Sequence, residues 1–197
     1  ISLYGLEIHE RTPFGKNVQI RKWVSEHHKL YEEMYLWAVI RLKEEDIIQY
    51  EVSNFSKNGS ESRNNLIVWS GNEYLGFGAG AHSYYKGTRK GNIGSVKNYI
   101  SHLKKNILPV EFEEKLSSAQ LALEFLMLGL RSIKGVNLQE WIERFDLEWS
   151  PQEERFVNSL YEQGYALNKN NNFCLTSKGM LLADRITVEM MPSNISH

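Results

Sequence analysis

The sequence has few of the residues that cross-link or anchor proteins. Its single cysteine, Cys174, excludes an internal disulfide and indicates a reducing, cytoplasmic setting. One cysteine cannot by itself hold an iron–sulfur cluster or a structural zinc ion. No apolar run approaches the roughly 20 residues that cross a bilayer, and no signal peptide is visible. These absences predict a protein without disulfides or a transmembrane segment.

An excess of either charge is also missing. The 197 residues include 23 Lys and Arg and 24 Asp and Glu, for a net charge of −1, and 42% of them are hydrophobic. This composition is typical of a folded protein with one large or two small domains, and its overall charge favours neither nucleic acid nor membranes. The chain starts at Ile1, inside an apolar segment, which predicts a piece of a longer protein.

The first half of the sequence predicts a βαβ unit. We expect a mostly buried strand over residues 1–8, a helix over 18–43 and a strand over 47–52. A connecting helix of this length implies that the two strands pair in parallel. His27 and His28 are adjacent on the helix and diverge, so we expect them on a solvated face and not at a shared metal.

The character of the chain changes at Pro109, where we divide it into domains of residues 1–110 and 111–197. A short amphipathic helix over 95–105 precedes the boundary. The second domain has the order helix, helix, helix, hairpin, helix, which is typical of a winged helix. The expected elements are helices over 117–131, 138–145 and 151–163, a hairpin from 165–167 and 173–175, and a helix over 177–190.

A winged helix suggests DNA binding, but the net negative charge of this domain makes DNA binding unfavourable. Residues 111–197 carry 8 Lys and Arg against 13 Asp and Glu, a net of −5, whereas residues 1–110 carry 15 against 11, a net of +4. Phosphate contacts need a basic surface. We therefore predict no nucleic-acid partner and expect a packing or lid domain.

Glycines, amides and aromatic residues concentrate between Tyr50 and Tyr85. We expect a strand over 50–54, a polar loop, an apolar run over 66–69 and a second apolar strand that ends in glycines. The run GFGAGA at 76–81 loosely matches the dinucleotide fingerprint G-x-G-x-x-A, but neither a helix start nor a later acidic residue accompanies it. Two interpretations stay open: backbone amides that approach a ligand at the end of a parallel strand, or a strand packed tightly against a helix.

The same stretch, YEVSNFSKNGSESRNNLIVWSGNEYLGFGAGAHSY, resembles the signature region of the oxygen-independent coproporphyrinogen III oxidase-like proteins. This is a radical S-adenosylmethionine family that includes heme chaperones. The resemblance covers nearly the whole chain and fits the chaperone-like branch better than the oxidase itself. It implies an α/β protein, α+β overall: the C-terminal part of a partial (β/α) radical-SAM barrel followed by a helical, winged-helix-like domain.

The resemblance also implies cofactors and sites. The full-length protein is expected to use S-adenosylmethionine and a [4Fe–4S] cluster on a C-x3-C-x2-C motif that is absent here, so this chain alone should be catalytically inert. The expected cofactor-binding residues are Gly76, Gly78, Gly80, Ala81 and His82. The expected substrate- or heme-binding residues are Arg63, Asn64, Asn65, Trp69 and His82.

This sequence departs from the family pattern at several positions, with Val68 in place of a tyrosine and His9 in place of a glutamate. Asn64 stands where the family has a histidine, and an amide is a poor ligand for heme iron. His82 is then the best remaining imidazole, unless it is hydrogen-bonded into the strand end. Trp69 either stacks on a flat macrocycle or is buried in a core. Ser62, Arg63 and Asn65 either bind propionates or position the loop, and Arg63 is the group there suited to bidentate carboxylate recognition.

From these features we predict a role in porphyrin or heme metabolism, as a heme chaperone with heme as ligand and a heme-receiving protein as partner. A first alternative is the true oxidase, which decarboxylates coproporphyrinogen III to protoporphyrinogen IX. A second alternative is an acidic winged-helix interaction module attached to an unrelated α/β domain.

Overall fold

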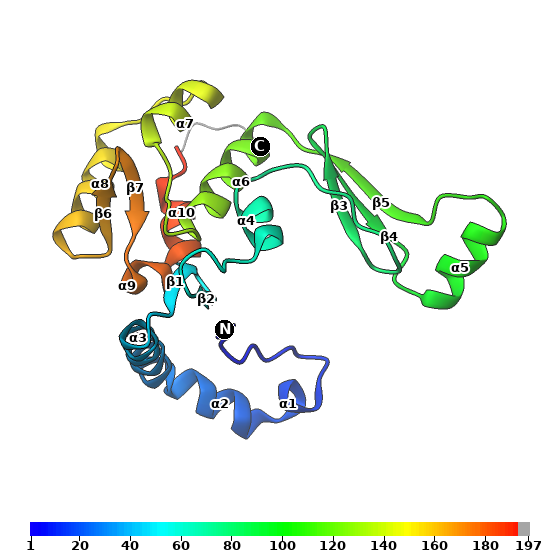
Figure 1. Cartoon of the computed structure of the whole chain (residues 1–197), viewed down its shortest axis with the longest axis horizontal. Coiled ribbons are helices and arrows are strands. Elements are labelled where there is room, and N and C mark those ends of the chain that lie inside the picture. The colour runs from blue at the N-terminus through cyan, green and yellow to red at the C-terminus, as the bar shows by residue number, and fades with distance from the viewer. Residues whose placement is uncertain (193–197) are drawn as a thin grey trace.

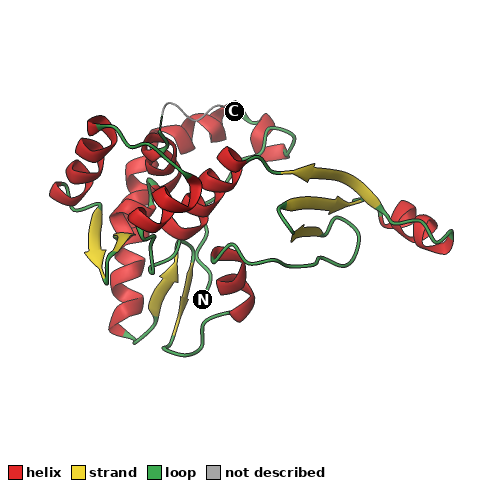
Figure 2. Cartoon of the chain, turned by 90° about the horizontal axis from the view of Figure 1, so that it is seen from above, coloured by secondary structure: helices red, strands yellow, loops and turns green. Residues whose placement is uncertain are grey.

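Two parts of the chain leave a packed helical body in different directions (Figure 1). In this computed structural model, which describes residues 1–192 apart from the side chain of His28, the body is the C-terminal unit, residues 116–192. The first part is a run of helices near the N-terminus. The second is the arm, residues 82–115, and a view from above separates it from the C-terminal helices (Figure 2).

The N-terminal segment is extended and then helical. Its helices are α1 (Pro13–Lys16), α2 (Val18–Glu26) and α3 (His28–Glu44). The predicted long helix is confirmed, with a break at His27, whose Nδ1 lies 2.6 Å from the carbonyl oxygen of Trp23. The side chain of His28 lies outside the described residues. Asn17 begins α2 by accepting hydrogen bonds from the backbone amides of its first turn.

The predicted strand over residues 1–8 is wrong. In this segment only Ser2 forms a β-bridge, with Asn54, and large side chains such as Tyr4 and Leu6 are exposed. Apolar composition alone suggested a buried strand here. Among the described residues, however, no sheet lies beside the segment after Leu3 to pair with it.

The predicted parallel βαβ pairing is also wrong. β1 (Ile48–Glu51) and β2 (Asn54–Ser56) form an antiparallel hairpin, which also replaces the single strand expected over 50–54. The other edge of β1 is occupied by the chain that follows α6, because Val52 N–H donates to Arg131 O and Ile133 N–H donates to Tyr50 O. Both edges of β1 are therefore used, and no edge remains for a parallel partner.

The apolar run after the polar loop is helical. It belongs to α4 (Arg63–Trp69), which Ser62 caps by accepting a hydrogen bond from the Asn65 amide at 3.3 Å. The second apolar strand is absent from the described chain, since around Tyr74 there is only an isolated bridge with Tyr84. The glycines 76–80 therefore lie in a loop before an antiparallel strand and not at the end of a parallel one.

The arm is a three-stranded antiparallel sheet that carries a helix at its far end (Figure 1). Its strands are β3 (His82–Tyr85), β4 (Thr88–Asn92) and β5 (Val110–Lys115), in that spatial order. The predicted helix over 95–105 is confirmed as α5 (Val96–Lys104), with Ser95 as its N-cap. β5 follows the predicted domain boundary in sequence but pairs with β4 before it, and the division at residue 110 stays a prediction.

The C-terminal unit has the predicted order of elements, except that the single helix expected over 177–190 is two helices separated by a turn at residues 181–182. Its elements are α6 (Ser118–Leu130), α7 (Leu138–Phe145), α8 (Pro151–Glu162), β6 (Ala166–Lys169), β7 (Asn172–Leu175), α9 (Ser177–Met180) and α10 (Ala183–Met190). Capping boxes at Ser117 and Ser150 begin α6 and α8. The main core lies in this unit, around the fully buried Trp141. Cys174 is also buried in this unit, and burial raises the pKa of its thiol. Neither in this unit nor in the rest of residues 1–192 is any helix long and apolar enough to cross a membrane.

Candidate functional site

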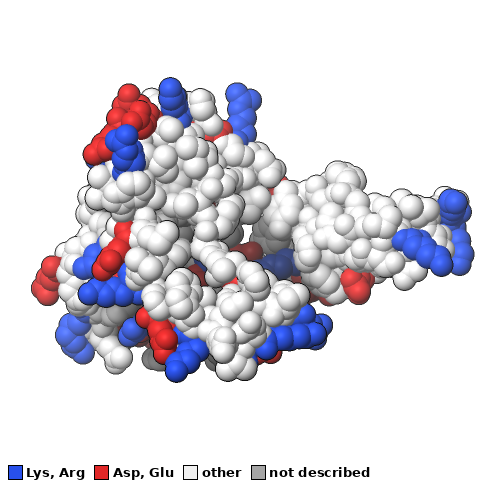
Figure 3. Space-filling model, turned by 90° about the horizontal axis from the view of Figure 1, so that it is seen from below, with Lys and Arg blue, Asp and Glu red and all other residues white. Residues whose placement is uncertain are grey.

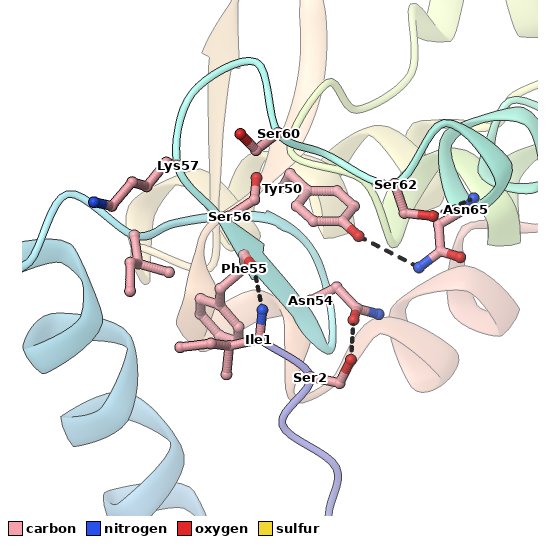
Figure 4. Close-up of a pocket in the computed structure, with 11 residues that line it drawn as sticks. Ile1, Ser2, Tyr50, Asn54, Phe55, Ser56, Lys57, Ser60, Ser62 and Asn65 are labelled. Atoms are coloured by element: carbon pink, nitrogen blue, oxygen red, sulfur yellow. Dashed lines mark hydrogen bonds between the residues drawn. The ribbon is translucent and has the colours of Figure 1, made fainter.

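A pocket of about 590 Å³ opens beside the β1–β2 hairpin (Figure 4). Its volume lies within the range of small-molecule sites, about 300–1,000 Å³. Its walls come from the N-terminal segment, the hairpin and the loop that leads into α4. The lining residues are Ile1, Ser2, Ile47, Tyr50, Asn54, Phe55, Ser56, Lys57, Ser60, Ser62 and Asn65.

Two side-chain hydrogen bonds connect the segments that form this pocket. Asn65, in the first turn of α4, donates from Nδ2 to the hydroxyl of Tyr50 on β1 at 3.3 Å. Ser2 donates from its hydroxyl to Asn54 Oδ1 at 2.5 Å. Figure 4 shows both contacts, with Tyr50 and Asn65 pointing toward each other. Because Ser62 caps the first turn of α4, it also positions Asn65 beside β1.

The lining is rich in hydroxyl and amide groups. Among the described lining residues, Lys57 has the only charged side chain, and none has a carboxylate or an imidazole. The Ser56 hydroxyl is buried, and the described part of the chain gives it no hydrogen-bond partner. Such a lining is suited to a polar ligand group that accepts hydrogen bonds, such as a carboxylate. The described lining residues include no histidine, cysteine or methionine, so Tyr50 is the only one of a type that ligates heme iron.

The predicted substrate residues divide between this pocket and other surfaces. Asn65 lines the pocket, whereas Arg63 and Asn64 are exposed on the outside of α4. Trp69 is half-buried and faces the C-terminal unit, where the guanidinium of Arg131 lies 6.0 Å from its ring. His82 is exposed on the arm, with its ring centroid 5.5 Å from that of Phe112. The structure therefore does not bring His82 to the same site as Asn65.

The predicted cofactor-binding loop uses its amides within the fold. Gly76 N–H donates to Ser83 Oγ at 2.9 Å, Gly78 N–H to the Tyr99 hydroxyl at 3.2 Å, and Gly80 N–H to Ile93 O at 3.1 Å. Ala81 N–H donates back to Gly78 O at 3.3 Å.

Glycine is required at one of these positions for packing. A Cβ at Gly76 would lie 2.1 Å from the carbonyl oxygen of His82. Close approach of two backbone segments therefore explains this glycine without a ligand. The cofactor-binding role of the loop stays a prediction.

The opposite face of β1 joins the hairpin to the C-terminal unit. Gln49 accepts a hydrogen bond from the Ser177 hydroxyl at 2.8 Å and donates to the Tyr35 hydroxyl at 2.5 Å. Tyr35 in turn donates to Val52 O at 2.8 Å. Burial, helped by the nearby Tyr31 and Glu51, raises the pKa of Tyr35 to about 12, although the Gln49 bond opposes the shift.

Glu51 is the unusual residue of this junction. It is fully buried, and neither carboxylate oxygen has a hydrogen-bond partner among the described residues. Sequence reasoning identified neither this residue nor the pocket serines Ser2, Ser56 and Ser60. The signals for the pocket were the predicted Asn65 and its neighbour Ser62, together with the polar loop after β2, which contains Ser60.

Comparison with known proteins gives consistent relatives for both parts of the chain. Residues 116–182 match the HemN C-terminal domain family. The chain is similar to the heme chaperone HemW of Bacillus subtilis, with 32% identity over 185 residues, covering 94% of this chain and 49% of that protein. It is 30% identical to the heme chaperone HemW of Lactococcus lactis, covering 100% of this chain and 51% of that protein.

A mitochondrial radical S-adenosyl methionine domain-containing protein 1 from Bos taurus is 30% identical, covering 97% of this chain and 46% of that protein. The chain thus spans about half the length of the curated relatives it matches. Coproporphyrinogen III oxidase (HemN) of Escherichia coli, a radical SAM enzyme, has a similar structure, with a TM-score of 0.60 and 13% identity over 79% of this chain and 39% of that one. At this identity the match shows the fold alone.

The residues present here do not fit the cluster that radical SAM relatives imply. Such clusters are held by several cysteine thiolates. This chain has one cysteine, which is buried, and the described residues contain no group of three or more His, Cys, Asp or Glu that could hold a metal ion. The amides of the glycine loop are likewise engaged, so they do not form an open cradle for S-adenosylmethionine.

Proposed function

The chain belongs to the HemN-like radical SAM family that includes the heme chaperones HemW, and we propose that it is the C-terminal portion of a heme-binding member, working as a carrier and not as a catalyst. The observation that carries this proposal is the 32% identity to a heme chaperone across 94% of the chain. The similarity crosses both the N-terminal half and the C-terminal unit, so the winged-helix part is not a module borrowed by an unrelated α/β domain.

In this proposal the pocket beside β1 and β2 binds the carboxylate edge of the porphyrin. The hydroxyls of Tyr50 and Ser62 and the amide of Asn65 donate hydrogen bonds to a propionate, and Lys57 adds a positive charge. Iron ligation then falls to another part of the longer protein, because His82 lies on the arm and does not line this pocket. S-adenosylmethionine and the cluster would likewise be held outside this chain, in a reducing, cytoplasmic protein.

Hemin titration tests this proposal. The protein encoded by the complete reading frame should show a Soret change with hemin, and the double variant Tyr50→Phe with Asn65→Ala should bind about 10-fold more weakly, as expected when polar contacts to a charged group are lost. The matched control is Asn64→Ala, which changes an exposed amide on the same helix. Its affinity should stay within about 2-fold.

Hemin dimethyl ester separates the two parts of the proposal. Because its propionates are esterified, the pocket variant should bind it as the unchanged protein does. An equal loss for hemin and for the ester would exclude the propionate assignment but leave heme binding intact. The absence of any Soret change with the complete protein would reject the carrier function itself.

Oxidation of coproporphyrinogen III is the alternative function, and it is the reaction named for the Escherichia coli enzyme whose fold this chain shares. Anaerobic incubation of the complete protein with coproporphyrinogen III, S-adenosylmethionine and a reductant distinguishes the two. We expect no consumption of the substrate. Catalytic turnover to protoporphyrinogen IX would establish the oxidase in place of the carrier.

A further inference from the structure

The loop between β2 and α4 contains the one Asn-Gly pair of the sequence, Asn58-Gly59. The pair forms the centre of a turn, which Ser60 N–H closes by donating to Lys57 O at 3.0 Å. Gly59 has a φ of +79°, which suits the third residue of a type II turn. Both residues are exposed, and no other described part of the chain lies within 4 Å of the position that a Cβ of Gly59 would take. The turn is therefore open to water.

The two residues of the pair have complementary reactivity. The side-chain amide carbon of Asn58 is an electrophile, and within residues 1–192 this amide forms no hydrogen bond. The backbone nitrogen of Gly59 can reach this carbon by closing a five-membered ring. Because glycine has no side chain, the nitrogen is not shielded from the approach. Nucleophile and electrophile therefore lie in adjacent residues, which favours an intramolecular reaction.

A carboxylate contacts the nitrogen that would attack. Gly59 N–H donates to Glu61 Oε1 at 3.2 Å. This distance is within the reach of a general base, about 2.6–3.2 Å between heavy atoms. Glu61 forms no ion pair in the described part of the chain. Its carboxylate is therefore placed to accept the proton of the Gly59 nitrogen.

We propose that Asn58 is a self-modification site, at which the Gly59 nitrogen attacks the Asn58 side chain with Glu61 as general base. The bond between Gly59 N and Asn58 Cγ forms while the nitrogen gives its proton to Glu61. The bond from Cγ to Nδ2 then breaks, and Nδ2 leaves as ammonia with that proton. Water opens the resulting cyclic imide at one of its two carbonyl carbons, which leaves aspartate or isoaspartate at position 58. The sequence of steps consumes water alone and needs no oxidant or reductant.

The product places a negative charge at the rim of the pocket. Lys57 and Ser60, on either side of the pair, line the pocket (Figure 4). On the face drawn in Figure 3, Lys and Arg side chains lie among Asp and Glu over the main body, so close neighbours determine the local charge. A carboxylate next to Lys57 in the chain opposes the attraction of its ammonium group for a propionate. This consequence rests on the proposed heme function, whereas the reaction itself does not.

Peptide mass spectrometry of the 197-residue chain tests the reaction without hemin. The chain is incubated at neutral pH in water enriched in oxygen-18, so the label marks product that forms before digestion. Trypsin then releases residues 58–63 as one peptide, which should gain the labelled carboxylate over days. Asn106 is the internal control, because it is exposed but is followed by the branched Ile107 and should stay unchanged. Absence of labelled product at Asn58 would overturn the proposal.

Glu61→Gln tests the general base. The variant should convert Asn58 about 10-fold more slowly, a modest loss because hydroxide from the solvent also reaches an exposed turn. The matched control is Glu154→Gln on α8, which removes the same charge from an exposed position of the C-terminal unit and should convert at the unchanged rate. Faster conversion in Glu61→Gln would mean that the hydrogen bond restrains the nitrogen, and would reject the base assignment.

The pH profile gives a second readout of this assignment. With Glu61 as the base, the rate should rise by less than 10-fold per pH unit near neutrality, whereas Glu61→Gln should approach a 10-fold rise because hydroxide alone remains. The same slope in both proteins would contradict a catalytic role for Glu61.

Asn58→Asp reproduces the charge of the product and tests its effect on the pocket. In the complete protein it should bind hemin about 3-fold more weakly and bind hemin dimethyl ester normally. Asn106→Asp on the arm is the control with the same added charge. Unchanged hemin affinity in Asn58→Asp would reject the link to the pocket. Failure of the unchanged protein to bind hemin would instead reject the proposed function and leave the chemistry of Asn58 standing.

Discussion

The two halves of this chain use apolar residues in opposite ways. Among the described residues, 19 apolar residues are buried, and 16 of them come after residue 110, where they surround Trp141. Within the same residues, 25 large apolar side chains are exposed, and 21 of them come before it. The C-terminal unit therefore carries its own core, whereas the N-terminal half holds its apolar side chains largely in solvent.

The difference shows where stability originates. The C-terminal unit has the capped helices, the hairpin and the closed core of an independent domain. The N-terminal half is attached to it mainly through β1, whose edge pairs with residues 131–133 and whose Gln49 contacts Ser177. In this chain the fold of the first half depends on the second.

A pair of tryptophan substitutions should give the largest contrast. Trp141 is fully buried and donates from its indole N–H to Ala122 O at 2.9 Å, so Trp141→Ala should lower the free energy of unfolding by about 3–5 kcal/mol. Trp37 is 67% exposed, and Trp37→Ala should change it by less than about 1 kcal/mol. Urea titrations followed by circular dichroism measure both. Similar losses would mean that the exposed face contributes as much as the core.

The pH dependence of stability tests the contribution of Tyr35 to the junction between β1 and the C-terminal unit. Because its pKa is raised to about 12 in the folded chain from an ordinary value of 10.0, the unfolded chain loses this proton first as the pH rises. The stabilisation is complete below pH 10 and is lost as the pH rises toward 12. Tyr35→Phe should cost about 1–2 kcal/mol at pH 7, from the lost hydrogen bonds, and should flatten this alkaline loss.

The measurement for Tyr35 is urea unfolding at a series of pH values from 7 to about 11. The pKa values of Tyr84 and Tyr161 are also raised by burial, so some alkaline loss will persist in Tyr35→Phe. Tyr85→Phe, at an exposed position of β3 away from this junction, is the matched control. An unchanged pH profile in Tyr35→Phe would place the source of the alkaline loss outside the junction.

Glu51 should give the smallest effect, and in the opposite direction. A buried carboxylate without hydrogen bonds opposes folding, and a neutral amide of the same shape costs less to bury. Glu51→Gln should therefore raise the free energy of unfolding by about 1 kcal/mol. Glu33→Gln, on the exposed side of α3, should leave it unchanged. Destabilisation by Glu51→Gln would mean that the carboxylate itself holds the two halves together.

The sequence predicted the C-terminal unit well because its signals are local. The bounds of α7 match the prediction, and serine caps and the glycine after α8 mark other ends. The N-terminal half gave poorer predictions for physical reasons. A short apolar run such as residues 66–69 fits a strand or a helix equally well, and only the Ser62 cap decides between them.

The candidate site was predicted only in part for a different reason. The pocket is lined by both Ser2 and Asn65, which are 63 positions apart in the sequence, and no local pattern reports that they share a site. The glycine loop was conspicuous in sequence, yet its amides serve the arm. Conspicuous composition located the right region, but the geometry within it depended on contacts between distant segments.

Successive residues of β1 face two different parts of the molecule. Tyr50 faces the pocket, while its neighbours Gln49 and Glu51 face the junction with the C-terminal unit. Substitutions along the strand should therefore alternate in phenotype, with one residue affecting the ligand and the next affecting the amount of folded protein in the cell. In a library of β1 variants, substitutions that lower ligand binding should alternate along the strand with substitutions that lower the abundance of the protein.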